Sequence, residues 1–281
     1  TLEIIYMIAF LILTSAGLAV IFGMMKVINL AHGEFVMVGG YTTIACAKAN
    51  INIYFAMLII APVVVGILGL LVERLVVRHL YGRMVDTMLA TWGLSLMMVG
   101  IVTFIFGNTA VSVPAPISGY SVGQFQMGGY NLFIIVIAAL LVVSMFLVMR
   151  FTRLGLVARG AMQSADVASS LGYDPQRVYM WTFAVGSALS GLAGGVLAPL
   201  TGLLPSSGAA YVAKAFITVV TGGGAFITGT LSSSIIFGSI NQAVSFASTP
   251  VIGEVVMLAI AVVLLRVMPQ GITGRFFRNA T

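Results

Sequence analysis

The sequence FTRLGLVARGAMQSADVASSLGYDPQRVYMWTFAVGSALSGLAGG, residues 151–195, joins a polar loop to a long apolar segment. All of its charged residues lie before the apolar part: Arg153, Arg159, Asp166, Asp174 and Arg177. From Val178 to Leu200 there is no charged residue. Because an apolar run of about twenty residues is long enough to cross a bilayer as a helix, the stretch predicts a water-exposed cytoplasmic loop, residues 151–177, framed by two membrane-spanning helices.

A short capped helix is predicted inside this loop. The Ser164 hydroxyl can accept from a backbone N–H at the start of a helix from Ala165 to Leu171, and Gly172 suits the left-handed residue that closes such a helix. Asp174-Pro175 then starts the next helix, with Asp as N-cap and Pro at the first helical position. A helix held in this way between two spans can transmit force from a soluble partner, but an ordinary connecting loop shows the same spacing.

The composition of the whole chain requires a lipid environment. The chain has 281 residues, of which 60% are hydrophobic and 7% are charged, and its mean hydropathy is +1.14. A soluble domain carries roughly 25% charged residues, so this chain cannot cover itself with an aqueous surface. Backbone polar groups in lipid must be paired within the chain, which leaves helices or closed barrels. Apolar runs near twenty residues favour helices.

The apolar segments predict an all-α polytopic membrane protein with about eight to nine transmembrane or re-entrant helices, in one domain covering residues 1–281. The segments are residues 4–23, 35–47, 53–72, 87–106, 130–149, 178–200, 211–221, 225–246 and 251–267. Two of them, 35–47 and 211–221, are too short to span a bilayer easily. If both cross fully, the total is nine, and if they are re-entrant or paired as broken helices, it is lower. Pro62 predicts a kink in its span.

The basic residues predict the orientation of the chain. The net charge of +6 is gathered in short clusters between spans, which is the positive-inside pattern rather than a nucleic-acid-binding signature. Ten arginines lie in residues 73–86, 150–177 and 266–281, whereas loops 108–129 and 201–210 carry no charge. We therefore expect the three basic regions and the C-terminus in the cytoplasm and the N-terminus outside, with Lys48 as the one exception.

A first candidate site follows the first span, at Asn29, His32, Gly33 and Glu34. A His and a Glu so close to a span are costly if they face lipid, and the Gly between them suggests a bend in the backbone. One interpretation is a discontinuous helix whose polar atoms line a translocation path. The alternative is a capped turn at the cytoplasmic surface, with Glu34 paired to Lys26 or His32. Two histidines and a single cysteine, Cys46, give little basis for a metal site or a disulfide.

A second candidate site is Gly222, Gly223 and Gly224. Three consecutive glycines weaken a helix, so they suggest a break whose free backbone groups face a solute, although tight helix packing or a plain turn remains an equal alternative. Together with the first site, the break places one interrupted segment in each half of the chain, as in an inverted repeat with a solute path between the halves. Lys214, the only charge in its segment, and Glu254 are expected at a membrane interface.

Three blocks of the sequence resemble permease subunits of branched-chain amino-acid ABC importers, a family that also includes urea permeases. They are GLAVIFGMMKVINLAHGEFVMVGGYTT, then TRLGLVARGAMQSADVASSLGYDPQRVYMWTFAVGSALSGLAGG, and then VVTGGGAFITGT. The resemblance covers nearly the whole chain. It implies a second homologous permease, two cytoplasmic ATPases and a periplasmic solute-binding protein as partners, in a bacterial inner membrane. It also implies that the second block contains the coupling helix seated in an ATPase, formed by Ser164, Ala165, Asp166, Val167, Ala168, Ser169, Ser170, Leu171 and Gly172.

The resemblance implies a transport subunit rather than an enzyme. The chain lacks the Walker A sequence GxxxxGK[ST], so we expect no cofactor in this chain and ATP bound by the partner ATPases. The expected solute is a branched-chain amino acid. Residues 84–95, MVDTMLATWGLS, look closer to urea permeases, which keeps urea or a short amide as an alternative. Two rival classes are a stand-alone channel or facilitator for a small neutral solute and an intramembrane enzyme using His32 and Glu34.

Overall fold

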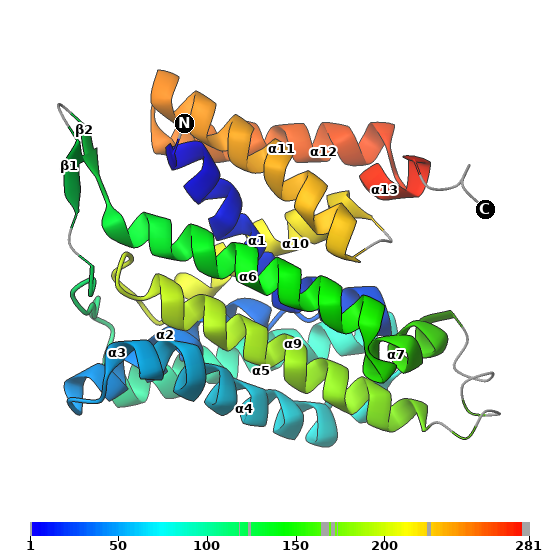
Figure 1. The fold of residues 1–281 in the computed structure, drawn as a ribbon. Helices are drawn as coiled ribbons and strands as arrows, with labels where there is room; N and C mark the ends of the chain where they lie inside the picture. Colours follow the sequence, from blue (N-terminus) through cyan, green and yellow to red (C-terminus); the bar gives the residue numbers. More distant parts are fainter. Residues whose placement is uncertain are drawn as a thin grey trace.

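The computed structural model describes residues 2–117, 119–122, 125–163, 169, 172, 174–223 and 226–276, and shows a bundle of long helices (Figure 1). The helices are α1 (Leu2–Met25), α2 (His32–Lys48), α3 (Ile53–Phe55), α4 (Ala61–Leu75), α5 (Met84–Phe106), α6 (Gly129–Phe151), α7 (Arg153–Gln163), α9 (Pro175–Leu197), α10 (Ser207–Gly222), α11 (Phe226–Ala247), α12 (Pro250–Val267) and α13 (Gly271–Phe276). A π-helical turn, Ala56–Ile60, joins α3 to α4, and a 3₁₀ turn, Val77–Leu80, follows α4.

The predicted all-α class is confirmed. In the described residues the only strands are β1 (Tyr120–Val122) and β2 (Phe125–Met127), which form a small antiparallel hairpin. Within the described part of the chain, six helices are long and apolar enough to cross a membrane, or up to seven if the bent pair α10 and α11 forms one span. The predicted count of eight to nine was approximate, because it also included α2, which has 17 residues, and counted the two members of the bent pair separately.

Local sequence explains where several helices begin. The Asp174 carboxylate accepts from the Gln176 N–H at 3.0 Å, and Pro175 occupies the first turn of α9, as predicted. Thr249 and Pro250 start α12 in the same way, with Thr249 Oγ1 accepting from the backbone at 3.3 Å. These side chains supply acceptors for N–H groups that have no partner inside the helix. The irregularity predicted at Pro62 is present as the π-helical turn just before it.

Helices α1 and α9 form the centre of the bundle and run antiparallel to each other. Small residues line their contact: a Cβ added to Gly17 would lie 2.3 Å from the Gly186 carbonyl oxygen and 2.4 Å from Ser190 Oγ. Helix α2 packs as closely on α9, because a Cβ on Gly39 would lie 2.4 Å from the Gly191 carbonyl oxygen. Without a hydrophobic driving force in lipid, such close backbone approach supplies much of the association of membrane helices.

The two halves of the chain pack in matching ways. Helix α9 packs on α1, α2 and α4, whereas α1 packs on α9, α10 and α11. Exchanging α1 with α9, α2 with α10 and α4 with α11 therefore reproduces the same set of neighbours. Because α1 and α9 are antiparallel, this is the arrangement that an inverted repeat produces. Helices α5, α6 and α12 lie outside this centre, and most of their apolar side chains are exposed, as expected for surfaces that face lipid.

The basic regions gather at one end of the bundle and the uncharged loops at the other. Hairpin β1–β2 and helix α7 mark these opposite ends in Figure 1. At the uncharged end, the backbones of Val111 and Leu203 exchange hydrogen bonds of 3.0 and 2.9 Å, which joins the two uncharged loops. At the basic end, the Arg78 guanidinium donates to Gln176 Oε1 at 2.6 Å, which joins the α4–α5 connection to the start of α9.

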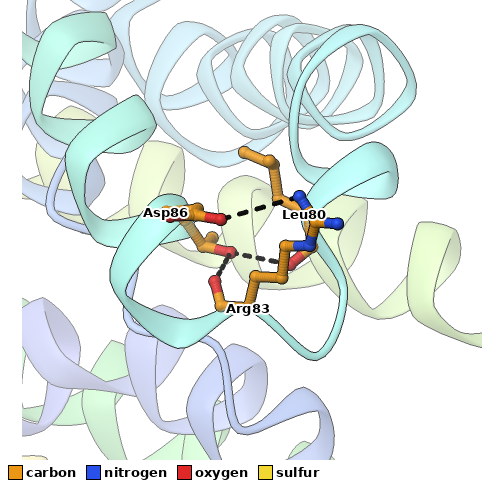
Figure 2. A network of polar contacts seen from close by, with 4 residues as sticks. Leu80, Arg83 and Asp86 are labelled. Carbon is orange, nitrogen blue, oxygen red and sulfur yellow. Dashed lines mark hydrogen bonds and ion pairs between the residues drawn. The ribbon is translucent and has the colours of Figure 1, made fainter.

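The turn that starts α5 is held by a small polar network. Thr87 Oγ1 lies 3.0 Å from the Leu80 carbonyl oxygen and 2.8 Å from the Arg83 carbonyl oxygen, and Arg83 pairs with Asp86 at 3.8 Å. Figure 2 shows Leu80, Arg83 and Asp86 grouped around this turn. The Tyr81 hydroxyl donates to Glu73, and burial together with this carboxylate raises the pKa of Tyr81. These contacts give the α4–α5 connection a defined shape at the basic end.

Replacing Gly39 by Ala should destabilise the protein by about 1–3 kcal/mol, because the added methyl group would overlap the α9 backbone. The matched control is Gly100→Ala in α5, where nothing lies within 4 Å of an added Cβ, and where Ala should stabilise the helix by up to about 1 kcal/mol. Thermal unfolding of the purified protein in detergent measures both changes. Equal melting temperatures for the two variants would contradict the packing described for α2 and α9.

Candidate functional site

Helix α2 begins near half the depth of the bundle rather than at its surface. The ring of His32, the first residue of α2, lies 2.7 Å through Nε2 from the carbonyl oxygen of Thr14, which is midway along α1. Eleven residues of α1 separate Thr14 from its end at Met25, which corresponds to about 17 Å. Residues 26–31 therefore carry the chain from the end of α1 back into the bundle without forming a helix.

The backbone groups released by this re-entry have polar partners. Asn29 Oδ1 accepts from the Ala31 N–H at 3.0 Å, and the Leu30 N–H donates to Thr91 Oγ1 on α5 at 3.1 Å. Asn29 is fully buried, and no described residue offers its Nδ2 a hydrogen-bond partner. Polar groups inside lipid must be satisfied within the protein, so Asn29 and Thr91 make the break in the helix possible.

His32 joins the two central helices. Its ring is fully buried, with Nε2 on the Thr14 carbonyl oxygen of α1 and Nδ1 3.1 Å from Ser190 Oγ of α9. A carbonyl oxygen can only accept, so Nε2 carries a proton. In the neutral ring Nδ1 can only accept, and its neighbour is the Ser190 hydroxyl, which also lies 3.0 Å from the Gly186 carbonyl oxygen. Both ring nitrogens therefore have partners in the protein, one on α1 and one on α9.

The N-termini of α2 and α10 meet at two glycines. A Cβ on Gly33 would lie 1.9 Å from the Gly208 carbonyl oxygen, and a Cβ on Gly208 would lie 2.7 Å from Glu34 Oε1. Glu34 is 3% exposed, and within the described ranges its Oε2 has no hydrogen-bond partner. Helix N-termini carry partial positive charge, so the arrangement places one carboxylate beside two favourable dipole ends inside the membrane. Such a junction of half-helices can recognise polar atoms of a solute.

The alternative of a capped turn at the cytoplasmic surface is not what the structure shows. Among the described residues Glu34 forms no ion pair with Lys26 or His32. Lys26 is exposed, with its ammonium 5.8 Å from the centre of the Phe22 ring. The sequence pattern could not reveal this difference, because a surface turn and a re-entrant break use the same residues. What separates them is the distant partner, Thr14 on α1.

The glycines of the second candidate site lie at the other end of α10. Gly222 packs against Gly229 of α11, since an added Cβ would lie 2.6 Å from that backbone. Gly223 has a φ of +87°, a left-handed conformation that favours glycine. The axes of α10 and α11 differ by 117° across this break, and Thr273 of α13 donates to the Gly222 carbonyl oxygen at 2.6 Å. Gly224 lies outside the described residues.

The two candidate sites are therefore not brought together. Gly208 and Gly222 are separated by fourteen residues of α10, or about 21 Å. The contacts of Gly222 and Gly223 agree with both non-solute interpretations of the glycine run, because Gly222 serves close helix packing and Gly223 a turn. The buried polar side chains of the first candidate site are those of Asn29, His32 and Glu34. Their neighbours in the fold are Thr14, Ser190 and Gly208. Nothing in the local sequence around these three residues marked them as partners of His32 and Glu34.

The predicted coupling segment is described only in part. Ser164, Ala165, Asp166, Val167, Ala168, Ser170 and Leu171 lie outside the described residues. Ser169 is exposed, Gly172 has a φ of +85°, and its N–H donates to the Ser169 carbonyl oxygen at 2.9 Å, which is the left-handed geometry expected of Gly172. The predicted loop differs in its first half, where α7 occupies Arg153–Gln163 and contacts α1, α6 and α9.

A bundle of lipid-facing helices with interrupted helices at its centre is the architecture of a membrane transport protein. The chain belongs to the family described as "Branched-chain amino acid transport system / permease component", which matches residues 1–265. This confirms the family resemblance seen in the sequence.

Relatives in several organisms carry names of the same kind. The high-affinity branched-chain amino acid transport system permease protein LivH of Escherichia coli strain K12 is 28% identical, over 94% of this chain and 91% of that protein. BraD of Pseudomonas aeruginosa, a permease protein of the same description, is 25% identical over 94% and 91%. A probable LivH of Methanocaldococcus jannaschii is 25% identical over 94% and 88%. No solved structure matches.

These names do not favour the urea alternative. The likeness of residues 84–95 to urea permeases finds no support in the relatives, which are named for branched-chain amino acids. In the structure, residues 84–95 form the first half of α5. Many of their side chains face outward, including Leu89 and Trp92, which are 59% and 55% exposed. A segment that faces lipid is a weak basis for assigning a solute.

Replacing His32 by Ala should lower the free energy of unfolding by about 2 kcal/mol or more, because the buried Thr14 and Ser190 oxygens would lose their shared partner. The matched control is His79→Ala, which removes the other histidine of the chain from an exposed position and should change stability by less than about 0.5 kcal/mol. Thermal unfolding in detergent compares the two. If both histidines proved equally dispensable, the assignment of His32 as the link between α1 and α9 would be wrong.

Proposed function

We propose that this chain is the transmembrane permease subunit of an ATP-driven ABC importer that takes up branched-chain amino acids across a bacterial inner membrane. The observation that carries the proposal is the match of the permease family to residues 1–265 of a multi-pass helical bundle. The names of the relatives support the solute class. The buried junction of α2 and α10 supports the transport role, because it places polar groups where a solute would cross.

The partners follow from the same assignment. A second homologous permease would complete the membrane unit, two cytoplasmic ATPases would bind and hydrolyse ATP, and a periplasmic protein would deliver the solute. No Walker A sequence is present in the 281 residues, which supports placing ATP on the partners and treating this chain as a transport subunit rather than an enzyme. The complete burial of His32 between α1 and α9 is consistent with a structural role for this ring.

Residues 164–172 would receive the force from an ATPase. Two connections would transmit a displacement of this segment into the membrane helices. The first is covalent, because the chain continues through Asp174 into α9. The second is the attachment of the α4–α5 connection to the start of α9, through Arg78 and Gln176 and through the edge-on rings of Tyr81 and Tyr179, whose centres are 5.2 Å apart. A displacement of the segment would therefore move α4, α5 and α9 together.

The translocation path would pass the junction of α2 and α10. Asn29, His32, Gly33 and Glu34 lie there. Among the described residues Asn29 Nδ2 and Glu34 Oε2 are buried without a hydrogen-bond partner, so a movement that opens the junction would expose them to a solute. For Gly222 and Gly223 the contacts support packing and a turn better than a path lining, and Gly224 lies outside the described residues. Closure of the ATPases would shift the helices around the junction and expose it alternately to the two sides of the membrane. A stand-alone channel would not need a capped segment such as the one that ends at the left-handed Gly172, because it receives no force from an ATPase.

Uptake by the reconstituted complex tests the proposal. Proteoliposomes with both permeases, the ATPases and the binding protein should accumulate leucine when ATP is supplied to the ATPases, and should not accumulate urea. The requirement for ATP follows from alternating access, because the bundle alone has no energy source. Leucine uptake at the same rate without the ATPases would identify a facilitator instead.

Replacing Ala168 by Arg should uncouple the complex, because a long charged side chain would enter the contact between residues 164–172 and an ATPase. Leucine uptake should fall while ATP hydrolysis continues and the protein stays in the membrane. The matched control is Gly160→Arg, which puts the same side chain on α7 at a position with nothing within 4 Å of an added Cβ. Loss of uptake in the control but not in the Ala168 variant would reject the coupling assignment.

The orientation can be tested by labelling single cysteines. After Cys46, the only native cysteine, is replaced by Ser, Ser112→Cys and Ser169→Cys place thiols at exposed positions at the uncharged and basic ends. A membrane-impermeant maleimide should label Ser112→Cys in intact spheroplasts, and Ser169→Cys only after the membrane is opened. We expect this because basic regions stay in the cytoplasm. The reverse pattern would invert the topology.

A further inference from the structure

A cleft lined by both charged and apolar side chains opens at the uncharged end of the bundle. It lies between α1, α10, α11 and α12 and has a volume of about 520 Å³. The wall residues that matter below are Glu3, Phe10, Lys214, Phe246 and Glu254. The cleft reaches from Glu3, near the start of α1, to Phe10, which is one helical turn from the middle of α1 at Thr14. It therefore extends from the surface into the depth of the membrane.

The floor of the cleft holds an ion pair. Lys214 Nζ on α10 and Glu254 Oε1 on α12 are 2.5 Å apart, and the side chains are 18% and 48% exposed. The Lys214 ammonium also lies 5.6 Å from the centre of the Phe10 ring. The two residues were expected to lie separately at a membrane interface, but they face one another inside the cleft. Charged groups within the membrane are costly and commonly mark the route of a substrate or an ion.

The ion pair is not needed to hold a tight helix contact. Helices α10 and α12 touch little, since α12 packs mainly on α11. The pair instead borders the open cleft, where water or a solute can reach the half-exposed Glu254 side chain. Desolvation usually offsets most of the gain from a partly buried ion pair, which leaves its contribution to stability small. Ser245 also lines the cleft, and its buried Oγ has no hydrogen-bond partner among the residues that the structure describes.

We propose that this cleft binds a zwitterionic amino acid with an apolar side chain, and that Lys214 and Glu254 are its specificity-determining residues. The α-carboxylate would pair with the Lys214 ammonium and the α-ammonium with the Glu254 carboxylate. The aliphatic side chain would lie against Phe10 and Phe246. This inference deepens the proposed function, because it names a site for the solute class, and it rests on that function.

The balance of charges selects the zwitterion. Separating Lys214 from Glu254 would leave two unpaired charges, but a zwitterion placed between them turns one ion pair into two and leaves no charge without a partner. A monocarboxylate or a monoamine can pair with only one of the two residues. A neutral amide such as urea can pair with neither, so the existing ion pair would exclude it. The ion pair thus selects solutes that carry both charges, whereas the apolar wall of the cleft selects among them by their side chains.

The position of the cleft fits an entry site. It opens at the end that we assign to the periplasm, where a binding protein would release its solute. Lys214 and Gly208 are six residues apart on α10, or about 9 Å along the helix, so the floor of the cleft lies close to the junction that holds Glu34. The cleft and the candidate path would therefore share α10 as a wall.

The test is a neutral double variant of the purified permease complex. In Lys214→Met with Glu254→Gln no charge is left unpaired, so the protein should fold and insert normally. Leucine binding, measured by calorimetry, should be weaker by about thirtyfold or more, as expected when a hydrogen-bonded charge pair is lost. The matched control is Lys48→Met, which removes an exposed cation at the same end of the bundle and should leave leucine affinity unchanged.

Probe molecules with one charge complete the experiment. The wild-type complex should bind leucine but neither 4-methylpentanoate nor isopentylamine, which carry only the carboxylate or only the ammonium group, nor urea. Unchanged leucine affinity in the folded double variant would overturn the site and assign the ion pair a structural role. Equal binding of leucine and 4-methylpentanoate would overturn the two-charge recognition.

The outcome can be separated from that of the proposed function. If the wild-type complex takes up leucine with ATP and the double variant takes it up at the same rate, the import function stands and the cleft is not the site. If the wild-type complex takes up no branched-chain amino acid, the proposed function fails. A binding assay with other zwitterionic amino acids would then test the cleft by itself, and absence of any charge-dependent binding would overturn it as well.

Discussion

The constraint on which this structure depends is that backbone polar groups inside lipid must find partners within the protein. Every interruption of a helix at membrane depth creates such groups, and residues 26–31 are the main interruption. Asn29 and Thr91 supply hydrogen bonds there, and His32 fixes the start of α2 to α1 and α9. The rest of the centre follows from this re-entry, because α2 can pack on α9 along its length only if it starts deep in the bundle.

Helix α10 connects the features that this arrangement produces. Its first turn touches Gly33 and Glu34, its middle presents Lys214 to the cleft, and its end at Gly222 and Gly223 packs against α11 and α13. The three places are aligned along one helix that runs parallel to α1 in the centre of the bundle. A shift of α10 would therefore alter the cleft, the junction with α2 and the contacts at the basic end at the same time.

Local features of the molecule could be predicted from the sequence. The spans, the left-handed Gly172 and the cap at Asp174 depend on residues within a few positions of one another, and each was found as expected. Helix α7 was not foreseen, because its residues are charged and glycine-containing and it packs on helices distant in the sequence. The depth of a break could not be predicted either: Asn29–Glu34 and Gly222–Gly224 show similar signals, yet partners far away in the chain place the described residues at different positions.

The candidate site likewise contains residues that the local sequence marks and partners that only the fold brings to it. Its own residues, Asn29, His32 and Glu34, were identifiable as polar groups beside a span. Their partners were not, since Thr14 and Ser190 are 18 and 158 residues from His32 and are ordinary hydroxyl residues in apolar helices. Lys214 and Glu254 were seen as isolated charges, and only the fold brings them together across 40 residues of sequence.

The contact between α1 and α9 has a mechanical consequence. At Gly17 and Gly186 the two backbones approach closely, and the side chains of Ile21 and Ser190 fill the remaining space against them, so little room is left to absorb a gradual displacement. Packed interfaces of this kind are held in discrete arrangements rather than deformed continuously. Helices α1 and α9 should therefore move together as one rigid unit. Gradual displacements should occur in the peripheral helices that surround them.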